Sequence, residues 1–293
     1  MRETTLSGTE PALAVERKSR TLTTREFKLF QELVYRQAGI FLSDAKRSLL
    51  VGRLSRRLRE LGIDSFGEYY RYVTKEDAAE GVRMLDCICT NETQFFREGR
   101  QFDFIEERVP ELRAKTAARG RRIRVWSAAC STGEEPYSLA MMLLTHFPPD
   151  SGWQVEILAS DLSTRALARA REGVWPVEKA REIPKPFLKR FMLRGTRSQD
   201  GKMKAGPEIR SAVRFERINL NDEGYAVKGP FDLVFCRNVL IYFDAQSKLR
   251  VIRNLLRHMA GGGYLFLGHS ESLLGIDQAV RRVGPTVYAV SPQ

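Results

Sequence analysis

The sequence has few features of a membrane, secreted or metal-binding protein. No apolar run approaches the ~20 residues that a membrane-spanning helix needs, and residues 1–20 lack the apolar core of a signal peptide. The four cysteines show no CxxC spacing, and the three histidines show no HxxxH or HxxE spacing. We therefore expect a cytoplasmic protein with buried free thiols, no metal site and no membrane insertion.

The chain also has fewer negatively charged than positively charged residues. The chain has 48 Lys and Arg residues against 36 Asp and Glu residues, which gives a net charge of +12. Such an excess favours an acidic partner, which can be a nucleic acid, an anionic membrane surface or a carboxylate-rich protein. The charge alone does not choose among the three.

The N-terminal third of the chain has a helical pattern. Residues 1–20 are polar and unpatterned, and we expect them to be disordered. From there a small all-α domain is expected over residues 21–90. Its first helix should begin with a capping box of Thr23 and Glu26 and end at Gly39, because glycine tolerates the left-handed conformation that closes many helices.

The second expected helix begins near Ser43, ends at Gly62 and is rich in positive charge. Either this face is simply solvated, or it binds an anionic partner that relieves the repulsion between its cations. We favour a binding surface. The basic residues are Lys46, Arg47, Arg53, Arg56, Arg57 and Arg59.

Residues 91–293 alternate between apolar strands and helices, which predicts an α/β domain with a mostly parallel sheet and helices on both faces. The expected strands are 123–129, 155–160, 231–236, 263–267 and 287–290. Glycines and short β-like pieces at about 195–215, including Ala212–Phe215, interrupt this rhythm. We predict a small antiparallel insertion there.

The turn after the first strand carries the most informative chemistry. It contains neither GxGxxG nor GxxxxGK[ST], which weakens a dinucleotide or nucleoside triphosphate assignment. Glu134 and Glu135 would repel phosphate but suit the sulfonium and amino groups of S-adenosylmethionine; alternatively, they only complement a helix N-terminus. Asp161, at the end of the second strand, can accept the ribose hydroxyls of an adenosine.

Several segments closely resemble the chemotaxis receptor methyltransferases, the CheR family. The resemblance covers residues 22–291 and implies a Rossmann-like class I methyltransferase domain with a small antiparallel β insertion, preceded by an all-α N-terminal domain. The segments are Thr90-Asn-Glu-Thr-Gln-Phe-Phe-Arg97, Ser131-Thr-Gly-Glu-Glu-Pro-Tyr-Ser138, Ala159-Ser-Asp161, Ile218-Asn-Leu220, Phe235-Cys-Arg-Asn-Val-Leu-Ile-Tyr-Phe243 and Gly268-His-Ser-Glu271.

The resemblance also implies a set of site residues. S-adenosylmethionine is the expected cofactor and S-adenosylhomocysteine the product, and Arg97 and Tyr242 are expected beside the transferred methyl group. The residues expected to contact the cofactor are Asn91, Thr93, Arg97, Glu135, Asp161, Asn219, Leu220, Arg237 and Asn238.

The implied reaction methylates glutamate side chains on the cytoplasmic domain of methyl-accepting chemoreceptors. A glutamate is already ionised at neutral pH, so no general base is needed. Arg97 would orient the carboxylate and Tyr242 would donate a hydrogen bond to it. Arg53, Arg56, Arg57 and Arg59 would hold the acidic receptor. In the family the β insertion can dock a receptor tail, and the sequence leaves this open here.

Two other functions compete with this prediction. A nucleic-acid methyltransferase fits the basic surface, but the Asn-Val-Leu-Ile-Tyr sequence at 238–242 lacks the prolines of the amino-methylase motif. Cys236, a conceivable nucleophile towards pyrimidines, is not preceded by proline. A non-catalytic sensor of S-adenosylmethionine is disfavoured because Arg97 and Tyr242 are both present. We therefore expect no nucleic-acid partner.

Overall fold

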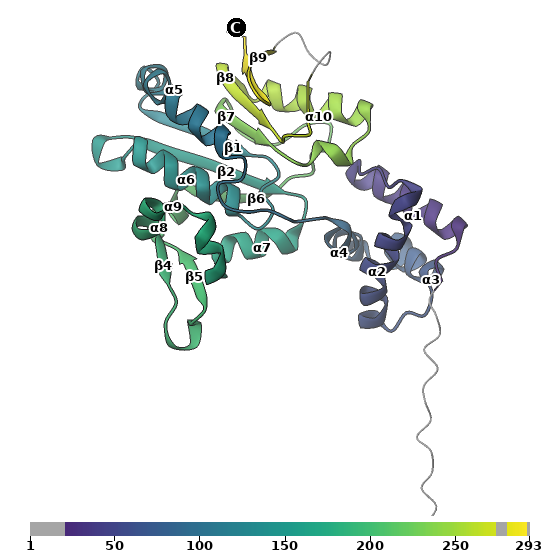
Figure 1. Ribbon diagram of the computed structural model, residues 1–293. Coiled ribbons are helices and arrows are strands. Elements are labelled where there is room, and N and C mark those ends of the chain that lie inside the picture. Colours follow the sequence, from purple (N-terminus) through teal and green to yellow (C-terminus); the bar gives the residue numbers. More distant parts are fainter. Residues whose placement is uncertain (1–20, 274–279, 292–293) are drawn as a thin grey trace, which may run out of the picture.

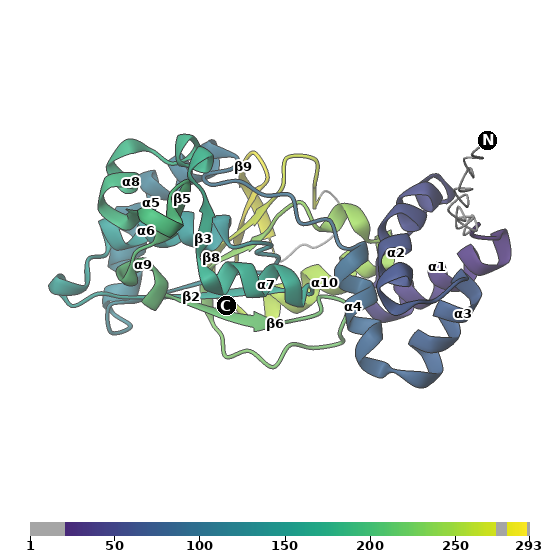
Figure 2. The ribbon, with the colours of Figure 1, turned by 90° about the horizontal axis from the view of Figure 1, so that it is seen from below.

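The computed structural model describes residues 21–273 and 280–291, so the expected disorder of residues 1–20 lies outside the described residues. Figure 1 shows a small helical unit, coloured purple to dark blue, beside a larger unit built on a twisted sheet. Figure 2 shows the same two units from below, with α4 lying next to α7 where they meet. Within the described ranges, no helix is long and apolar enough to cross a membrane.

The N-terminal unit is all-α, and its helix ends follow the sequence signals. The Thr23 hydroxyl accepts from Glu26 N at 3.2 Å, and the Glu26 carboxylate accepts from Thr23 N at 2.8 Å, which confirms the capping box. Gly39 and Gly62 end their helices in the left-handed conformation, as predicted. The elements are α1 (Thr24–Ala38), η1 (Asp44–Lys46), α2 (Arg47–Leu61), α3 (Phe66–Arg71), η2 (Tyr72–Glu76) and α4 (Ala78–Ile88).

One carboxylate is buried in the apolar core of this unit. Glu80 is fully buried and accepts from Arg57 Nε and Nη2, each at 2.7 Å, and from the Tyr69 hydroxyl at 2.9 Å. Burial alone would raise the pKa of Glu80, but the hydrogen bonds from Arg57 and Tyr69 outweigh it and lower the pKa. A charged, fully partnered group therefore fixes α2 against α3 and α4.

The second unit contains a seven-stranded sheet in the order β6-β2-β1-β7-β8-β10-β9. The first five strands in this order are parallel, and β10 runs antiparallel to both of its neighbours. This confirms the predicted Rossmann-like sheet. The strands are β1 (Arg122–Ser127), β2 (Gln154–Asp161), β6 (Val213–Arg217), β7 (Phe231–Cys236), β8 (Met259–Leu267), β9 (Val280–Gly284) and β10 (Val287–Val290).

Helices cover both faces of this sheet. Successive side chains of a strand point to opposite faces, so Val125 packs with α5 and α6 while Trp126 packs in the separate core under α10. Both faces are apolar, as parallel strands require. The helices are α5 (Gly99–Ala117), α6 (Glu134–His146), α7 (Thr164–Glu172) and α10 (Ala245–Arg257).

The small antiparallel sheet differs in extent from the sequence prediction. It has the order β3-β5-β4 and begins at Val174, well before the expected residue 195. Ala212–Phe215, expected within the insertion, instead leads into edge strand β6, which pairs in parallel with β2. A short, half-buried edge strand has no hydropathy signature that separates it from a hairpin. The elements are β3 (Val174–Pro176), η4 (Val177–Glu182), α8 (Lys185–Phe191), β4 (Met192–Arg194), β5 (Lys202–Ala205) and α9 (Pro207–Ser211).

Polar contacts hold the two units together. Thr164 Oγ1 donates to the Asp86 carboxylate, and Asn219 Nδ2 donates to Gln37 O at 2.7 Å. A Cβ atom on Gly39, whose φ is +68°, would lie 2.5 Å from Asn221 Oδ1, so a larger residue there would have to displace the Asn221 side chain. The end of α1 is thus docked onto the segment that follows β6.

We expect the substitution Glu80→Gln to lower the free energy of unfolding by about 3 kcal/mol, because it leaves the half-buried Arg57 guanidinium without its buried carboxylate partner. Since the pKa of Glu80 is lowered in the folded protein, its contribution is present at neutral pH and is lost as the pH falls through that pKa. Denaturant unfolding at neutral and acidic pH measures both effects. Glu60→Gln, at an exposed partner of Arg57, is the matched control and should change little.

Candidate active site

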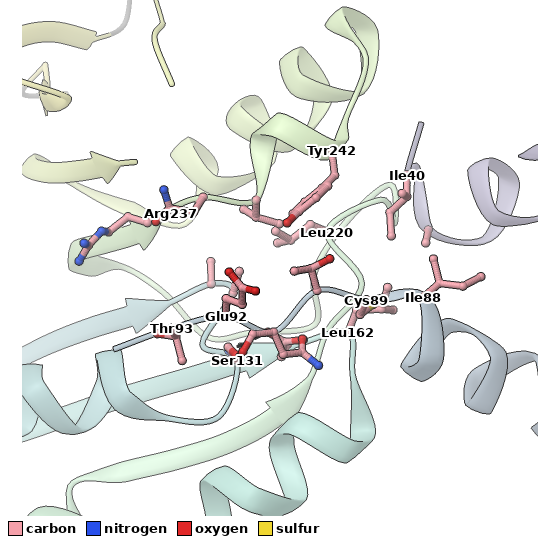
Figure 3. Close-up of a pocket in the computed structure, with 18 of the residues that line it drawn as sticks. Ile40, Ile88, Cys89, Glu92, Thr93, Ser131, Leu162, Leu220, Arg237 and Tyr242 are labelled. Carbon is pink, nitrogen blue, oxygen red and sulfur yellow. Dashed lines mark hydrogen bonds between the residues drawn. The ribbon is translucent and has the colours of Figure 1, made fainter. Parts of the chain in front are cut away.

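A cavity lies at the carboxyl ends of β1, β2 and β7, and the N-terminal unit closes one side of it (Figure 3). In a doubly wound sheet this edge is where ligands bind, at the point where the strand order reverses. Every residue expected to contact the cofactor or the methyl group lines this cavity. They are Asn91, Thr93, Arg97, Glu135, Asp161, Asn219, Leu220, Arg237, Asn238 and Tyr242.

The turn after β1 directs one of its two glutamates into the cavity. Glu135 lines the cavity and accepts from Ser127 Oγ at 2.6 Å. Glu134 is buried elsewhere and pairs with Lys179 Nζ at 2.6 Å, so it has a structural role. Gly133, with φ of +97°, makes the turn that precedes both glutamates. Only Glu135 is therefore available to a ligand.

Arg237, at the end of β7, is the buried cation of the site. Its Nη1 lies 3.4 Å from Glu135 Oε2, and its Nη2 lies 3.5 Å from Glu98 Oε2 and donates to Arg97 O. Burial raises the pKa of Glu135, and the charge of Arg237 opposes this rise. Arg237 Nε is buried without a hydrogen-bond partner among the described residues. Its unmet donor suits a ligand that carries an acceptor such as a carboxylate.

Asp161 ends β2 and faces the same cavity. Its Oδ2 accepts from Ser131 N at 2.8 Å, and its Oδ1 accepts from Ser163 N at 2.9 Å. Burial raises the pKa of Asp161 in spite of these hydrogen bonds. Each oxygen keeps a further lone pair, so the carboxylate can also accept two vicinal hydroxyl groups.

The wall beyond Asp161 is apolar. Leu220 is buried and lines the cavity with Leu162 and Ile218. The side chain of Asn219 is committed to the protein, because its Nδ2 donates to Gln37 O and its Oδ1 accepts from Asn221 N at 3.1 Å. Asn219 thus shapes the loop, while the apolar side chains offer a surface for a flat ring.

The segment after β7 is fixed by one carboxylate. Glu271 accepts from Asn238 N at 2.9 Å, Leu240 N at 2.8 Å and Gly268 N at 2.7 Å. Asn238 has a φ of +56°, a conformation that non-glycine residues rarely adopt. Figure 3 shows the Tyr242 ring pointing into the cavity from this segment. Glu271 lies in the Gly268-His-Ser-Glu271 segment, but its place in the sequence gives no sign of this role.

The linker between the units crosses the opening of the cavity. Asn91 O accepts from Ser131 Oγ at 2.9 Å, and Thr93 O accepts from Lys179 Nζ at 3.0 Å, which ties the linker to the sheet. Among the residues that the structure describes, the Arg97 guanidinium makes one hydrogen bond, at 3.3 Å to Glu92 O. The guanidinium can therefore turn towards a ligand at little cost.

Lys46 is a site residue that the sequence analysis placed only on the basic helix face. Its Nζ lies 5.3 Å from the centroid of the Tyr242 ring, and both residues line the cavity. The α-helical unit thus contributes a cation to the end of the cavity where Tyr242 lies. The spacing of residues in the sequence gave no signal for this contact, because it depends on how the two units dock.

The four arginines expected to bind a receptor do not behave alike. Arg53 lines the cavity and donates from Nη2 to Thr90 Oγ1 at 2.8 Å. Arg56 and Arg59 are exposed on α2. Arg57 is different, because both sides of its guanidinium are engaged by Glu80 and Glu60. This corrects the expectation for Arg57, which braces the helical core instead of presenting a free charge.

The residues that line the cavity fit S-adenosylmethionine. Asp161 suits a ribose, the apolar wall suits an adenine ring, Glu135 suits an ammonium group, and Arg237 suits a carboxylate. A Rossmann-like sheet whose last but one strand, β10, is antiparallel to its neighbours and this donor set together define an S-adenosylmethionine-dependent methyltransferase of class I. The fold and the site together thus give the class of enzyme.

Comparisons with known proteins narrow this class to one family. The family model described as CheR methyltransferase, all-alpha domain, matches residues 25–89, and the model described as CheR methyltransferase, SAM binding domain, matches residues 91–289. The chain belongs to the CheR methyltransferase family and binds S-adenosylmethionine.

Similar proteins cover almost the whole chain. Chemotaxis protein methyltransferase 2 of Pseudomonas aeruginosa is 40% identical over 91% of this chain and 93% of its own length. The chemotaxis protein methyltransferase of Salmonella typhimurium is 37% identical over 97% and 96%, and that of Escherichia coli is 38% identical over 92% of each chain. This protein is therefore a methyltransferase of the chemotaxis type.

We expect Glu271→Gln to weaken binding of S-adenosylhomocysteine by at least about tenfold, since one acceptor oxygen becomes an NH2 group that cannot accept from the backbone N–H beside it. Isothermal titration measures the affinity, and a thermal scan measures the stability. The exposed Glu223→Gln is the matched control. Unchanged affinity in Glu271→Gln would show that the segment after β7 holds its shape without this carboxylate.

Cofactor affinity should depend on pH through the two cavity carboxylates. Burial raises the pKa of both Asp161 and Glu135, so the free protein holds their protons more tightly than an unfolded chain does. Ribose hydroxyls and an ammonium group bind the ionised forms, so affinity should rise as the pH rises through the raised pKa values. Titrations with S-adenosylhomocysteine at several pH values below neutrality measure this dependence. The Glu135→Gln variant should show a smaller change of affinity with pH. An affinity that does not change with pH, with no proton released on binding, would contradict the roles given to Asp161 and Glu135.

Proposed function

We propose that this methyltransferase transfers the methyl group of S-adenosylmethionine to glutamate side chains on the cytoplasmic domain of methyl-accepting chemoreceptors. The products are a glutamate methyl ester and S-adenosylhomocysteine. The observation that carries the proposal is that Arg97 and Tyr242 both line the cavity, together with Arg53 of the basic helix α2. A guanidinium and a phenol there suit a carboxylate acceptor, and the similar proteins carry the name chemotaxis protein methyltransferase.

In this proposal the cavity holds the cofactor along its length. Asp161 accepts the ribose hydroxyls, and Leu220 and its apolar neighbours pack on the adenine. Glu135 binds the amino group of the methionine portion and Arg237 its carboxylate. Backbone groups of Asn219 and Asn238, with the linker residues Asn91 and Thr93, complete the set of contacts.

Bound S-adenosylmethionine supplies a methyl group on a positively charged sulfur. The acceptor needs no base, because a glutamate with an ordinary pKa of about 4.3 is ionised at neutral pH. The protein then contributes position, which can lower the barrier by roughly 7–11 kcal/mol when the reacting groups are aligned. Arg97 orients one oxygen of the acceptor, and the Tyr242 hydroxyl donates to the other. The carboxylate then faces the methyl carbon.

The loose anchoring of Arg97 suits this role. A guanidinium fixed in a bidentate pair would stabilise the ground state of the carboxylate and slow the transfer. Arg97 has one weak hydrogen bond of its own, while its backbone oxygen is held by Arg237. The backbone is therefore rigid, and the charged end of the side chain remains adjustable.

The basic residues of α2 would bring the acidic receptor to this opening. The residues proposed for this contact are Arg53, Arg56 and Arg59. Arg57 is left out because its guanidinium is paired with Glu80 and Glu60. Opposite charges across such a surface raise the encounter rate, and salt weakens them. Reversing the charge of Arg56 and Arg59 should therefore raise KM for the receptor and leave cofactor affinity unchanged.

We expect Arg97→Ala to lower kcat by about a hundredfold or more while S-adenosylhomocysteine still binds, because the variant loses an interaction with the acceptor in the transition state. Steady-state methylation and titration of the product measure the two effects. Arg100→Ala, an exposed arginine at the start of α5, is the matched control. Unchanged turnover in Arg97→Ala contradicts the role given to this residue.

Methyl transfer from radiolabelled S-adenosylmethionine to receptor-containing membranes tests the function itself. Label that enters protein and leaves as volatile methanol in mild base identifies a carboxyl methyl ester. Base-stable label in protein, or label in added nucleic acid, would give the enzyme a different substrate. Binding of the cofactor without any transfer would instead support the sensor alternative.

A further inference from the structure

The charges that line the cavity do not by themselves match its ligand. S-adenosylmethionine carries a sulfonium, an ammonium and a carboxylate, so its net charge is positive. Among the described residues that line the cavity, cationic side chains outnumber carboxylates by four to three. An excess of positive charge would repel this ligand. The cations are Lys46, Arg53, Arg97 and Arg237, and the carboxylates are Glu92, Glu135 and Asp161.

One further carboxylate, that of Glu98, lies behind this lining. Glu98 follows Arg97 in the chain and has a φ of +61°, just before α5 begins. Non-glycine residues are uncommon in this left-handed region, and those that adopt it cluster at functional sites. The Glu98 side chain is 5% exposed, and its Oε2 lies 3.5 Å from Nη2 of Arg237. With Glu98 included, the positive and negative charges at the cavity balance.

The negative charge of Glu98 is only partly compensated by its neighbours. Its Oε1 accepts from His269 N at 3.1 Å and from Asn238 Nδ2 at 3.5 Å. Its Oε2 is buried and has no hydrogen-bond donor among the described residues. The nearby Arg237 guanidinium is shared with Glu135, whose Oε2 lies 3.4 Å from Nη1. Two buried carboxylates thus share one guanidinium, which leaves an excess of negative charge at this wall of the cavity.

The charge of Glu98 acts on a group that faces the ligand. Burial is the largest cause that raises the pKa of Glu135, the charge of Arg237 lowers it, and the charge of Glu98 raises it further. An interaction that disfavours a second negative charge at Glu135 favours a positive charge beside it. Glu98 therefore attracts a cationic ligand, although it is not among the residues that line the cavity.

We propose that Glu98 is a specificity-determining residue that distinguishes S-adenosylmethionine from S-adenosylhomocysteine by charge. Methyl transfer converts the sulfonium into a neutral thioether, so the substrate carries one more positive charge than the product. The charge of Glu98 acts on this difference, because the two ligands otherwise present the same groups to the site. It strengthens binding of the substrate relative to the product and so favours exchange after each turnover. The inference requires binding of S-adenosylmethionine and is independent of the identity of the acceptor.

The substitution Glu98→Gln tests this role, because it removes the charge and keeps the shape of the side chain. Isothermal titration of the full chain without an acceptor gives affinities for S-adenosylmethionine, S-adenosylhomocysteine and sinefungin. Sinefungin is an analogue in which a protonated amine replaces the methylated sulfonium. We expect the variant to weaken binding of the two cationic ligands about tenfold more than binding of S-adenosylhomocysteine. A general loosening of the site would weaken all three equally and leave the ratios unchanged.

Two further variants serve as controls. Glu98→Asp keeps the charge, so the ratios of the affinities should stay within about twofold of the wild-type ratios even if each affinity falls. Glu107→Gln removes an exposed carboxylate from the same helix, α5, and should leave all three affinities unchanged. Glu98→Ala also removes the charge, and it carries the test if Glu98→Gln does not fold.

Three results would overturn the inference. Equal weakening of all three ligands in Glu98→Gln would show that Glu98 only holds Asn238 and His269 in place. Unchanged affinities would show that the ligand does not sense its charge. The same change of ratios in Glu98→Asp as in Glu98→Gln would show that the shape of the side chain decides. Because no acceptor takes part, a failure to methylate chemoreceptors would contradict the proposed function and leave these titrations unaffected.

Discussion

Arg237 is the cation on which the geometry of the site depends. It is buried at the end of β7, lies 3.4 Å from Glu135 and 3.5 Å from Glu98, and holds the backbone oxygen of Arg97. One side chain thus joins the sheet, the first turn and the linker. Without it, the largely buried Glu135 and Glu98 carboxylates would lose their buried positive partner, which costs several kcal/mol for each ion. The linker would also lose one of its ties to the larger unit.

The two units supply different parts of the site. The sheet presents Asp161 and Glu135 at its carboxyl edge, where the parallel strands end and the cofactor binds. The helical unit closes the cavity with its linker and adds Lys46 beside Tyr242. Methyl transfer would therefore take place at the boundary between the two units. In the proposed function, an acceptor bound to the helical unit would meet a cofactor bound to the sheet.

Local signals were enough to predict much of this from the sequence. The capping box at Thr23 and the strand that ends at Asp161 depend on neighbours in the chain. The parts that failed depend on distant contacts. Arg57 has a buried partner 23 positions away, and the edge strand Val213–Arg217 is defined only by its pairing with β2. The three backbone amides held by Glu271 belong to segments that the sequence does not show as neighbours.

A crystal structure of the protein with S-adenosylhomocysteine tests the central claim most directly. The account predicts the ribose on Asp161, the amino acid portion between Glu135 and Arg237, and the sulfur facing the opening between Arg97 and Tyr242. A product molecule bound with its sulfur turned away from Tyr242, or bound outside this cavity, would contradict the account. The site of methyl transfer would then have to be sought elsewhere on the molecule.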